Sequence, residues 1–252
     1  MKNAVKMRDD EIKEFVKKSY AKVATLECSC CSDSSQLLSG IETAALAGYS
    51  HEELKDLPAQ VKQMFAGCGN PVALSELKVG ETVLDIGSGG GLDAFLAAKK
   101  VGTTGRVVGI DFTREMIRKA MRNAKGLGLK NVEFRFGDAE DMPVETSSVD
   151  VVISNCVINL APDKDKVFKE TYRVLKLGGR MIISDIVTEE ELPEEIRRDP
   201  RYWAGCVSGA LEIEDYLRKI RKAGFRHVKV LSRANFTKTI LSIVVKAQKS
   251  ED

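Results

Sequence analysis

The stretch that decides the fold runs from Val83 to Gly91 and reads Val-Leu-Asp-Ile-Gly-Ser-Gly-Gly-Gly. Val83, Leu84 and Ile86 predict a buried strand, the glycines predict a tight turn, and residues 92–101 predict a helix. Glycines let a backbone approach a ligand closely and adopt dihedral angles closed to other residues. A buried strand, a glycine turn and a helix N-terminus together predict a nucleotide-sized binding edge.

Two common nucleotide motifs fail at this turn. A G-x-G-x-x-G pattern starting at Gly87 would place its third glycine at Leu92, and no Gly-Lys-Ser/Thr follows. The pattern present is Asp85-x-Gly87-x-Gly89-x-Gly91, whose acidic residue suits a cationic sulfonium and would repel a phosphate. This pattern resembles the first motif of class I S-adenosylmethionine-dependent methyltransferases. The alternative is a glycine turn that only packs a strand on a helix.

Predicted strands and helices alternate from residue 81 onward. Strands are expected at 82–86, 106–111, 131–136, 149–154, 180–185, 226–231 and 239–246, and helices at 92–101, 114–127, 164–175 and 213–223. This order predicts a doubly wound, Rossmann-like α/β sheet of seven strands with a largely parallel core. The segment 187–212 lacks a clear period and is expected to cover the top of the sheet.

Acidic or amide side chains stand at the predicted carboxyl ends of successive strands. Asp111 ends the second strand and can accept hydrogen bonds from ribose hydroxyls, whereas Asp138 follows the third and can accept from an adenine amino group. These positions match the ribose-binding and adenine-contacting positions of the methyltransferase family. The resemblance implies that S-adenosylmethionine is bound by Asp85, Gly87, Ser88, Gly89, Gly91, Asp111, Phe112, Asp138, Ala139 and Asn155.

The N-terminal part of the chain differs in character from the rest. Apolar residues at helical spacing between Asp9 and Ala24 predict an amphipathic helix, and a loop carrying Cys28, Cys30 and Cys31 follows. No second Cys/His pair at a suitable spacing completes a structural zinc site. Residues 41–65 predict one or two short helices. We therefore expect an N-terminal helical cap with a Cys-rich loop over 1–75 and a methyltransferase domain over 76–252.

Composition restricts the class of protein. Of 252 residues, 43% are hydrophobic, which is enough for a full core. The net charge of +2, from 39 basic and 37 acidic residues, argues against a nucleic-acid partner. No apolar run approaches the roughly 18 residues of a membrane span, and the charged N-terminus lacks a signal-peptide core. We expect a cytoplasmic chain whose six cysteines are thiols.

The strings around three cysteines are the most informative about the methyl acceptor. They are GCGNP around Cys68, SNCVINL around Cys156 and WAGCVSGAL around Cys206. Together with the Cys-rich loop, they look like the arsenite methyltransferases over about residues 10–246. The resemblance implies that Cys68, Cys156 and Cys206 bind As(III) as catalytic thiolates. It also implies that a cysteine among Cys28, Cys30 and Cys31 passes arsenic in or exchanges disulfides, and that a thioredoxin- or glutathione-like external thiol re-reduces the protein.

The residue inventory agrees with such an acceptor. Only two histidines are present, His51 and His227, and neither lies near the motifs, which limits general-base chemistry. As(III) held by thiolates, or delivered as a thiol conjugate, has a lone pair and no proton to lose, so it can attack a sulfonium methyl once positioned. Two alternatives stay open: a methyltransferase for a quinone- or sterol-like molecule with the cysteines as packing, or a thiol-based metalloid-binding protein. Nothing in the sequence indicates an oligomeric state.

Overall fold

The computed structural model describes residues 7–26, 40–237 and 239–250. The expected Cys-rich loop with Cys28, Cys30 and Cys31 therefore lies outside the described residues. None of the helices in the described ranges is long and apolar enough to cross a bilayer.

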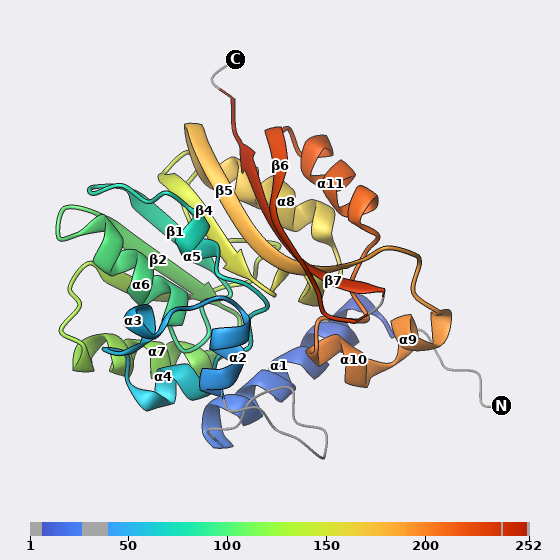
Figure 1. Ribbon diagram of the computed structural model, residues 1–252, viewed down its shortest axis with the longest axis horizontal. Helices are drawn as coiled ribbons and strands as arrows, with labels where there is room; N and C mark the ends of the chain where they lie inside the picture. The colour runs from blue at the N-terminus through green and yellow to red at the C-terminus, as the bar shows by residue number, and fades with distance from the viewer. Residues whose placement is uncertain (1–6, 27–39, 238, 251–252) are drawn as a thin grey trace.

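A seven-stranded mixed sheet forms the centre of the molecule (Figure 1). Its strands are β1 (Thr82–Ile86), β2 (Arg106–Asp111), β3 (Val132–Phe136), β4 (Val149–Asn155), β5 (Leu175–Thr188), β6 (Arg226–Asn235) and β7 (Ile240–Gln248). The strand order is β3-β2-β1-β4-β5-β7-β6. The strands from β1 to β5 pair in parallel, and β7 pairs antiparallel with both β5 and β6. The predicted doubly wound fold with a largely parallel core is confirmed.

Side chains alternate between two cores along the strands, as the two-residue period requires. Val83 of β1 belongs to the core beneath α6 (Leu92–Val101) and α7 (Arg114–Gly126). Leu84 and Ile86 belong to the core on the opposite face, beneath α8 (Lys164–Val174) and α11 (Ile213–Lys222). Parallel strands buried on both faces read as continuous apolar runs, which is why the sequence located them well.

The N-terminal segment adds five helices to this sheet. They are α1 (Asp9–Leu26), α2 (Gly40–Leu46), α3 (His51–Leu54), α4 (Ala59–Gln63) and α5 (Pro71–Leu74). The amphipathic helix predicted from Asp9 is confirmed, since Ile12, Val16 and Val23 are buried. Residues 41–65 hold three short helices instead of one or two. A capping box between Ser50 and Glu53 starts α3, and Pro58 precedes α4.

The segment after β5 also carries short helices. It contains α9 (Glu194–Arg198) and α10 (Pro200–Ala204), and α10 lies against α1 (Figure 1). A 3-10 turn, η1 (Ile158–Leu160), follows β4 and contacts α10. The expected covering segment is thus a pair of short helices resting on the N-terminal helix and on the loop that follows β4.

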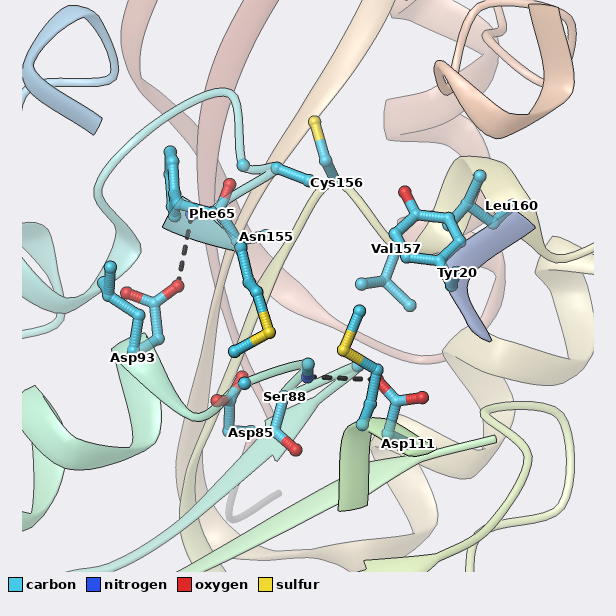
Figure 2. A pocket seen from close by; sticks show the side chains of 18 of the residues that line it. Tyr20, Phe65, Asp85, Ser88, Asp93, Asp111, Asn155, Cys156, Val157 and Leu160 are labelled. Atoms are coloured by element: carbon cyan, nitrogen blue, oxygen red, sulfur yellow. Dashed lines mark hydrogen bonds between the residues drawn. The ribbon is translucent and has the colours of Figure 1, made fainter. Parts of the chain in front are cut away.

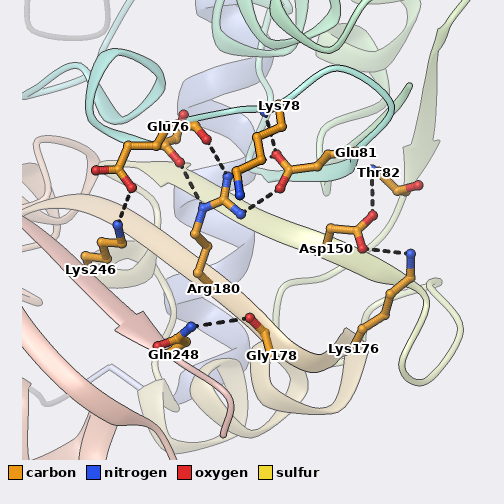
Figure 3. Close-up of polar contacts among 11 residues, drawn as sticks. Glu76, Lys78, Glu81, Thr82, Asp150, Lys176, Gly178, Arg180, Lys246 and Gln248 are labelled. Atoms are coloured by element: carbon orange, nitrogen blue, oxygen red, sulfur yellow. Dashed lines mark hydrogen bonds and ion pairs between the residues drawn. The ribbon is translucent and has the colours of Figure 1, made fainter. Parts of the chain in front are cut away.

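The amino ends of the strands are held by an ion-pair network (Figure 3). Arg180 of β5 lies 2.7 Å from Glu81 and donates to the carbonyl oxygens of Ser75 and Glu76. The Arg180 and Glu81 side chains are only 14% and 15% exposed. This network ties the segment before β1 to β5 at the edge of the sheet opposite the carboxyl ends.

Replacing Arg180 with methionine is expected to lower the free energy of unfolding by about 2 kcal/mol, because Glu81 is left without its partner in a largely buried place. Arg233→Met is the control, since Arg233 and Glu189 form a pair that is half exposed, and a change within about 0.5 kcal/mol is expected. Urea denaturation measures both. Equal losses in the two variants would contradict this account.

The Arg180 effect should depend on pH in a defined direction. Burial alone would raise the pKa of Glu81, but hydrogen bonds from Arg180 and the Lys78 amide outweigh it and hold the pKa below 4.5. A lowered carboxyl pKa stabilises the fold above the unfolded-state value, and the stabilisation is lost as the pH falls through the folded-state value. The difference between wild type and Arg180→Met should therefore shrink below about pH 4.

Candidate active site

The turn after β1 is built from glycines with left-handed backbone angles. Gly87, Gly89 and Gly91 have φ values of 70°, 51° and 98°. A Cβ added to Gly87 would collide with the Val157 side chain, so this turn packs directly on the loop after β4. Gly91 is the N-cap residue of α6. The sequence pattern is thus explained by backbone geometry and by close approach together.

An open cleft of about 730 Å³ lies at the carboxyl ends of β1, β2 and β4 (Figure 2). A neighbouring cavity of about 420 Å³ shares Gly87, Asp111 and Phe112 with it. Seven of the predicted cofactor residues line the cleft: Asp85, Gly87, Ser88, Gly89, Asp111, Phe112 and Asn155. Asp138 and Ala139 line the neighbouring cavity, whereas Gly91 lines neither, since it begins the helix behind the turn.

Three buried carboxyl groups line one side of the cleft. Figure 2 shows Asp85, Asp93 and Asp111 there, with Cys156 at the other end. Burial raises the pKa of Asp93 and of Asp111 to about 6. Burial, together with the charges of Asp93 and Asp111, raises the pKa of Asp85 well above 3.8. The side chain of Asp111 accepts hydrogen bonds from the amides of Gly89, at 3.0 Å, and Thr113, at 2.8 Å. Such a cluster favours a cationic ligand, because a positive charge relieves the mutual repulsion.

Asn155 lies between this acidic side and the loop that carries Cys68. Its Oδ1 accepts from the Cys68 amide at 2.9 Å, and its Nδ2 donates to the Gly69 carbonyl at 2.7 Å. Nδ2 also contacts Tyr49 Oη at 3.0 Å and Asp93 Oδ2 at 3.2 Å. Asn155 was predicted as a cofactor residue, and the structure adds a second task, because its amide fixes the backbone around Cys68.

The three cysteines singled out in the sequence lie next to one another, and of these Cys156 lines the cleft. Cys68 and Cys156 form a disulfide with a Cα–Cα distance of 6.0 Å. The thiol of Cys206 donates to the Cys156 carbonyl oxygen at 3.0 Å. Cys156 and Cys206 are 4% and 3% exposed. The expectation of thiols throughout differs from the structure at Cys68 and Cys156, since the fold brings these two sulfur atoms into bonding range.

Backbone conformation adds to the unusual character of these positions. Cys156 and Cys206 have positive φ values of 57° and 63°, which cost free energy in residues other than glycine. Such strained residues gather at functional sites. Ser184 and Ser242 hold Cys68 on its other side, through contacts of 3.4 Å to its sulfur and 2.6 Å to its carbonyl oxygen.

The two histidines belong to other elements of the fold. His51 begins α3 and His227 belongs to the edge strand β6, and neither lines the cleft. Within the described ranges, no group of three His, Cys, Asp or Glu side chains is arranged to hold a metal ion. Cys68 and Cys156 are joined in a disulfide in this conformation.

Several cleft residues were not identified from the sequence. Tyr20 of α1, Met64, Phe65 and Met116 line the cleft, and so does Asp93 in the first turn of α6. Their periodicity indicated only helical faces, which does not distinguish a core position from a cleft wall. Asp93 alone carried a signal, as a carboxylate two residues after the glycine turn.

The sheet order, the antiparallel β7 and the acidic glycine cleft define a class I methyltransferase fold. A model of the methyltransferase domain family matches residues 77–224. An arsenite methyltransferase of Halobacterium salinarum is 43% identical over 92% of this chain and 61% of its own length. The human arsenite methyltransferase is 35% identical over 87% of this chain and 59% of its own. The chain therefore spans about 60% of the length of these curated relatives.

This chain covers a larger share of one solved structure than of these curated relatives. The arsenic(III) S-adenosylmethionine methyltransferase of Chlamydomonas reinhardtii is 35% identical, with a TM-score of 0.67 over 80% of this chain and 73% of that one. The chain belongs to the arsenite methyltransferase family.

Proposed function

We propose that this chain transfers methyl groups from S-adenosylmethionine to As(III) held by Cys68, Cys156 and Cys206. The observation that carries the proposal is the convergence of three cysteines from distant parts of the sequence, one of which, Cys156, lines an acidic cleft. Family membership leaves open how many sulfur atoms hold arsenic and which reductant serves the enzyme, and we propose both.

The polar side chains of the cleft match the polar groups of S-adenosylmethionine. Among the described residues, Asp85 Oδ2 and Ser88 Oγ are buried without a hydrogen-bond partner, and a buried polar atom in that state calls for a ligand group. Asp85 would hold the positively charged end of S-adenosylmethionine, Asp111 the ribose hydroxyls, and Asp138 with Ala139 the adenine. When bound, the donor supplies a methyl group on a positively charged sulfur.

The cysteines supply the acceptor site. Arsenite exchanges its three hydroxyl groups for three thiolates, and the three thiol protons leave in the water released. Soft thiolates suit a soft, thiophilic centre. The arsenic lone pair needs no base to expose it, which agrees with a cleft that no histidine lines. The task of the protein is to hold the two reactants together and exclude water.

Redox balance explains the need for an external thiol. Methylation uses the arsenic lone pair and so raises As(III) to As(V). Two thiols that become one disulfide return two electrons and restore As(III), and Cys68 with Cys156 is the pair within reach. A thioredoxin- or glutathione-like reductant then reopens the disulfide. We propose a reducing compartment, the cytoplasm, because the cycle starts from thiolates.

The test supplies arsenite and S-adenosylmethionine with and without a thiol reductant. Continued production of methylated arsenic is expected only with the reductant, and without it the yield should stop near one methyl group per initially reduced protein molecule. Mass spectrometry of arsenic species and alkylation mapping of Cys68 and Cys156 give the two readouts. Turnover on a small organic acceptor, with no arsenic product under either condition, would overturn the proposal.

A further inference from the structure

Lys13 of α1 joins the N-terminal helix to the rim of the cavity lined by Asp138 and Ala139. Its Nζ lies 2.7 Å from Asp138 Oδ2 and 2.7 Å from Glu140 Oε2. The Lys13 side chain is 28% exposed and that of Glu140 only 9%. Lys13 itself lines this cavity.

Glu140 connects Lys13 to the start of α8. While Oε2 pairs with Lys13, Oε1 accepts a hydrogen bond from the Asp163 amide at 3.0 Å. Asp163 is the N-cap residue of α8. Lys13 is thereby connected to the helix layer of the main domain, and charge-assisted bonds in a partly buried place are among the stronger contacts available to a surface helix. Burial alone would lower the pKa of Lys13, but the hydrogen bonds to both carboxylates outweigh it and keep the ammonium charged.

The same helix also forms a wall of the cysteine site. Ile12 and Val16, on either side of Lys13 in the sequence, pack in one apolar cluster with Cys156 and Cys206. One turn further on, Tyr20 lines the cleft, and its hydroxyl donates to the Ala204 carbonyl at 3.3 Å, two residues before Cys206. Figure 1 shows α1 running beside α10, and Figure 2 shows Tyr20 beside Val157 and Leu160.

We infer that Lys13 is a positioning residue that fastens α1 over both sites, so that donor release and exposure of the cysteines depend on one ion-paired contact. This inference rests on the proposed function for the identity of the donor. It follows from the arrangement because α1 contacts the adenine-side rim through Lys13 and the cysteine cluster through Ile12 and Val16. A helix that loosens at the rim also uncovers the cysteines.

The experiment compares Lys13→Met with Lys18→Met. Lys18 lies on the same helix, and its ion pair among the described residues is an exposed contact with Glu14. Lys18→Met therefore removes one positive charge from α1 without removing the contact to Asp138 and Glu140. The first readout is the dissociation rate of S-adenosylhomocysteine, measured by displacement without arsenic or turnover. Lys13→Met should release it about tenfold faster, which corresponds to about 1.4 kcal/mol, and Lys18→Met should match wild type.

The second readout is the iodoacetamide alkylation rate of Cys206 in the reduced protein. Lys13→Met is expected to raise this rate about tenfold, and Lys18→Met to leave it within about twofold. Lys13→Arg should largely restore both readouts, because the charge and its partners are kept. Glu140→Gln weakens the same contact without changing α1, so it separates loss of the anchor from damage to the helix.

The outcomes separate this inference from the proposed function. Equal rates for Lys13→Met and Lys18→Met in both readouts would overturn the inference, even if arsenic is methylated. Faster release and faster alkylation in Lys13→Met would support it, even if arsenic is not the acceptor. A wild-type chain that does not bind S-adenosylhomocysteine would refute both.

Discussion

Cys206→Ser is expected to reduce arsenite methylation by at least about 100-fold, which is more than the usual cost of losing a group that only supports a ligand. A hydroxyl group replaces the soft thiolate, so arsenic is left with at most two sulfur ligands and no fixed place in front of the donor. The site is buried, and the Cys206 thiol already contacts the Cys156 backbone, so no other thiol in the described residues can take its place. The measurement is turnover in the presence of a thiol reductant.

Ser208→Ala provides the control in the same loop. Ser208 is also buried and donates to the Ile196 and Asp199 carbonyl oxygens, so the change disturbs the loop without removing a thiol. We expect a loss of about tenfold at most, with S-adenosylhomocysteine affinity unchanged in both variants. Full activity in Cys206→Ser would remove this cysteine from the mechanism.

Asp85→Asn is expected to weaken donor binding by about 10- to 100-fold, since hydrogen bonds to charged groups contribute about 1.5–3 kcal/mol. The carboxylate is buried at the end of β1, and its Oδ2 has no partner among the described residues. The matched control is Asp150→Asn on β4. Asp150 accepts from the Thr82 amide and pairs with Lys176 at the opposite edge of the sheet (Figure 3), so donor affinity should not change. Isothermal titration measures both, and equal affinities in the two variants would contradict the assignment of Asp85.

The same carboxyl groups predict how donor binding depends on pH. Because burial raises the pKa of Asp111 to about 6, this group takes up a proton as the pH falls toward 6, and the raised pKa of Asp85 acts in the same direction. A cation favours their ionised forms, so donor binding releases protons and affinity rises with pH in this range. Asp85→Asn should show a smaller rise. An affinity independent of pH between 5 and 8 would contradict this reading of the acidic cluster.

The elements bounded by glycines and buried runs could be predicted from the sequence. The bounds of β1, α6 and β2 agree with the predicted 82–86, 92–101 and 106–111. The predicted strand 180–185 is shorter than β5, which spans Leu175–Thr188. In the structure β5 continues through Gly178, although its φ of 75° is left-handed, and the Gly178 amide donates to the Lys249 carbonyl oxygen. Tertiary pairing overrides local preference there.

Some residues of the candidate site could likewise be predicted from the sequence, and others could not. The residues on the glycine turn and strand ends were predictable, because the topology of a parallel sheet fixes where such ends meet. Lys13 and Tyr49 were not, because they reach the site from segments far away in the sequence, Lys13 through Asp138 and Tyr49 through Asp93. The roles of Cys68, Cys156 and Cys206, and the choice among Cys28, Cys30 and Cys31, stay predictions.

The number of sulfur atoms bound to arsenic in the reduced protein decides whether three cysteines hold the acceptor. X-ray absorption spectroscopy at the arsenic edge, on protein loaded with one equivalent of arsenite, counts the sulfur neighbours. We predict three sulfur ligands in wild type and two sulfur ligands with one oxygen in Cys206→Ser. Three oxygen neighbours in wild type, or the same spectrum in both proteins, would contradict the account.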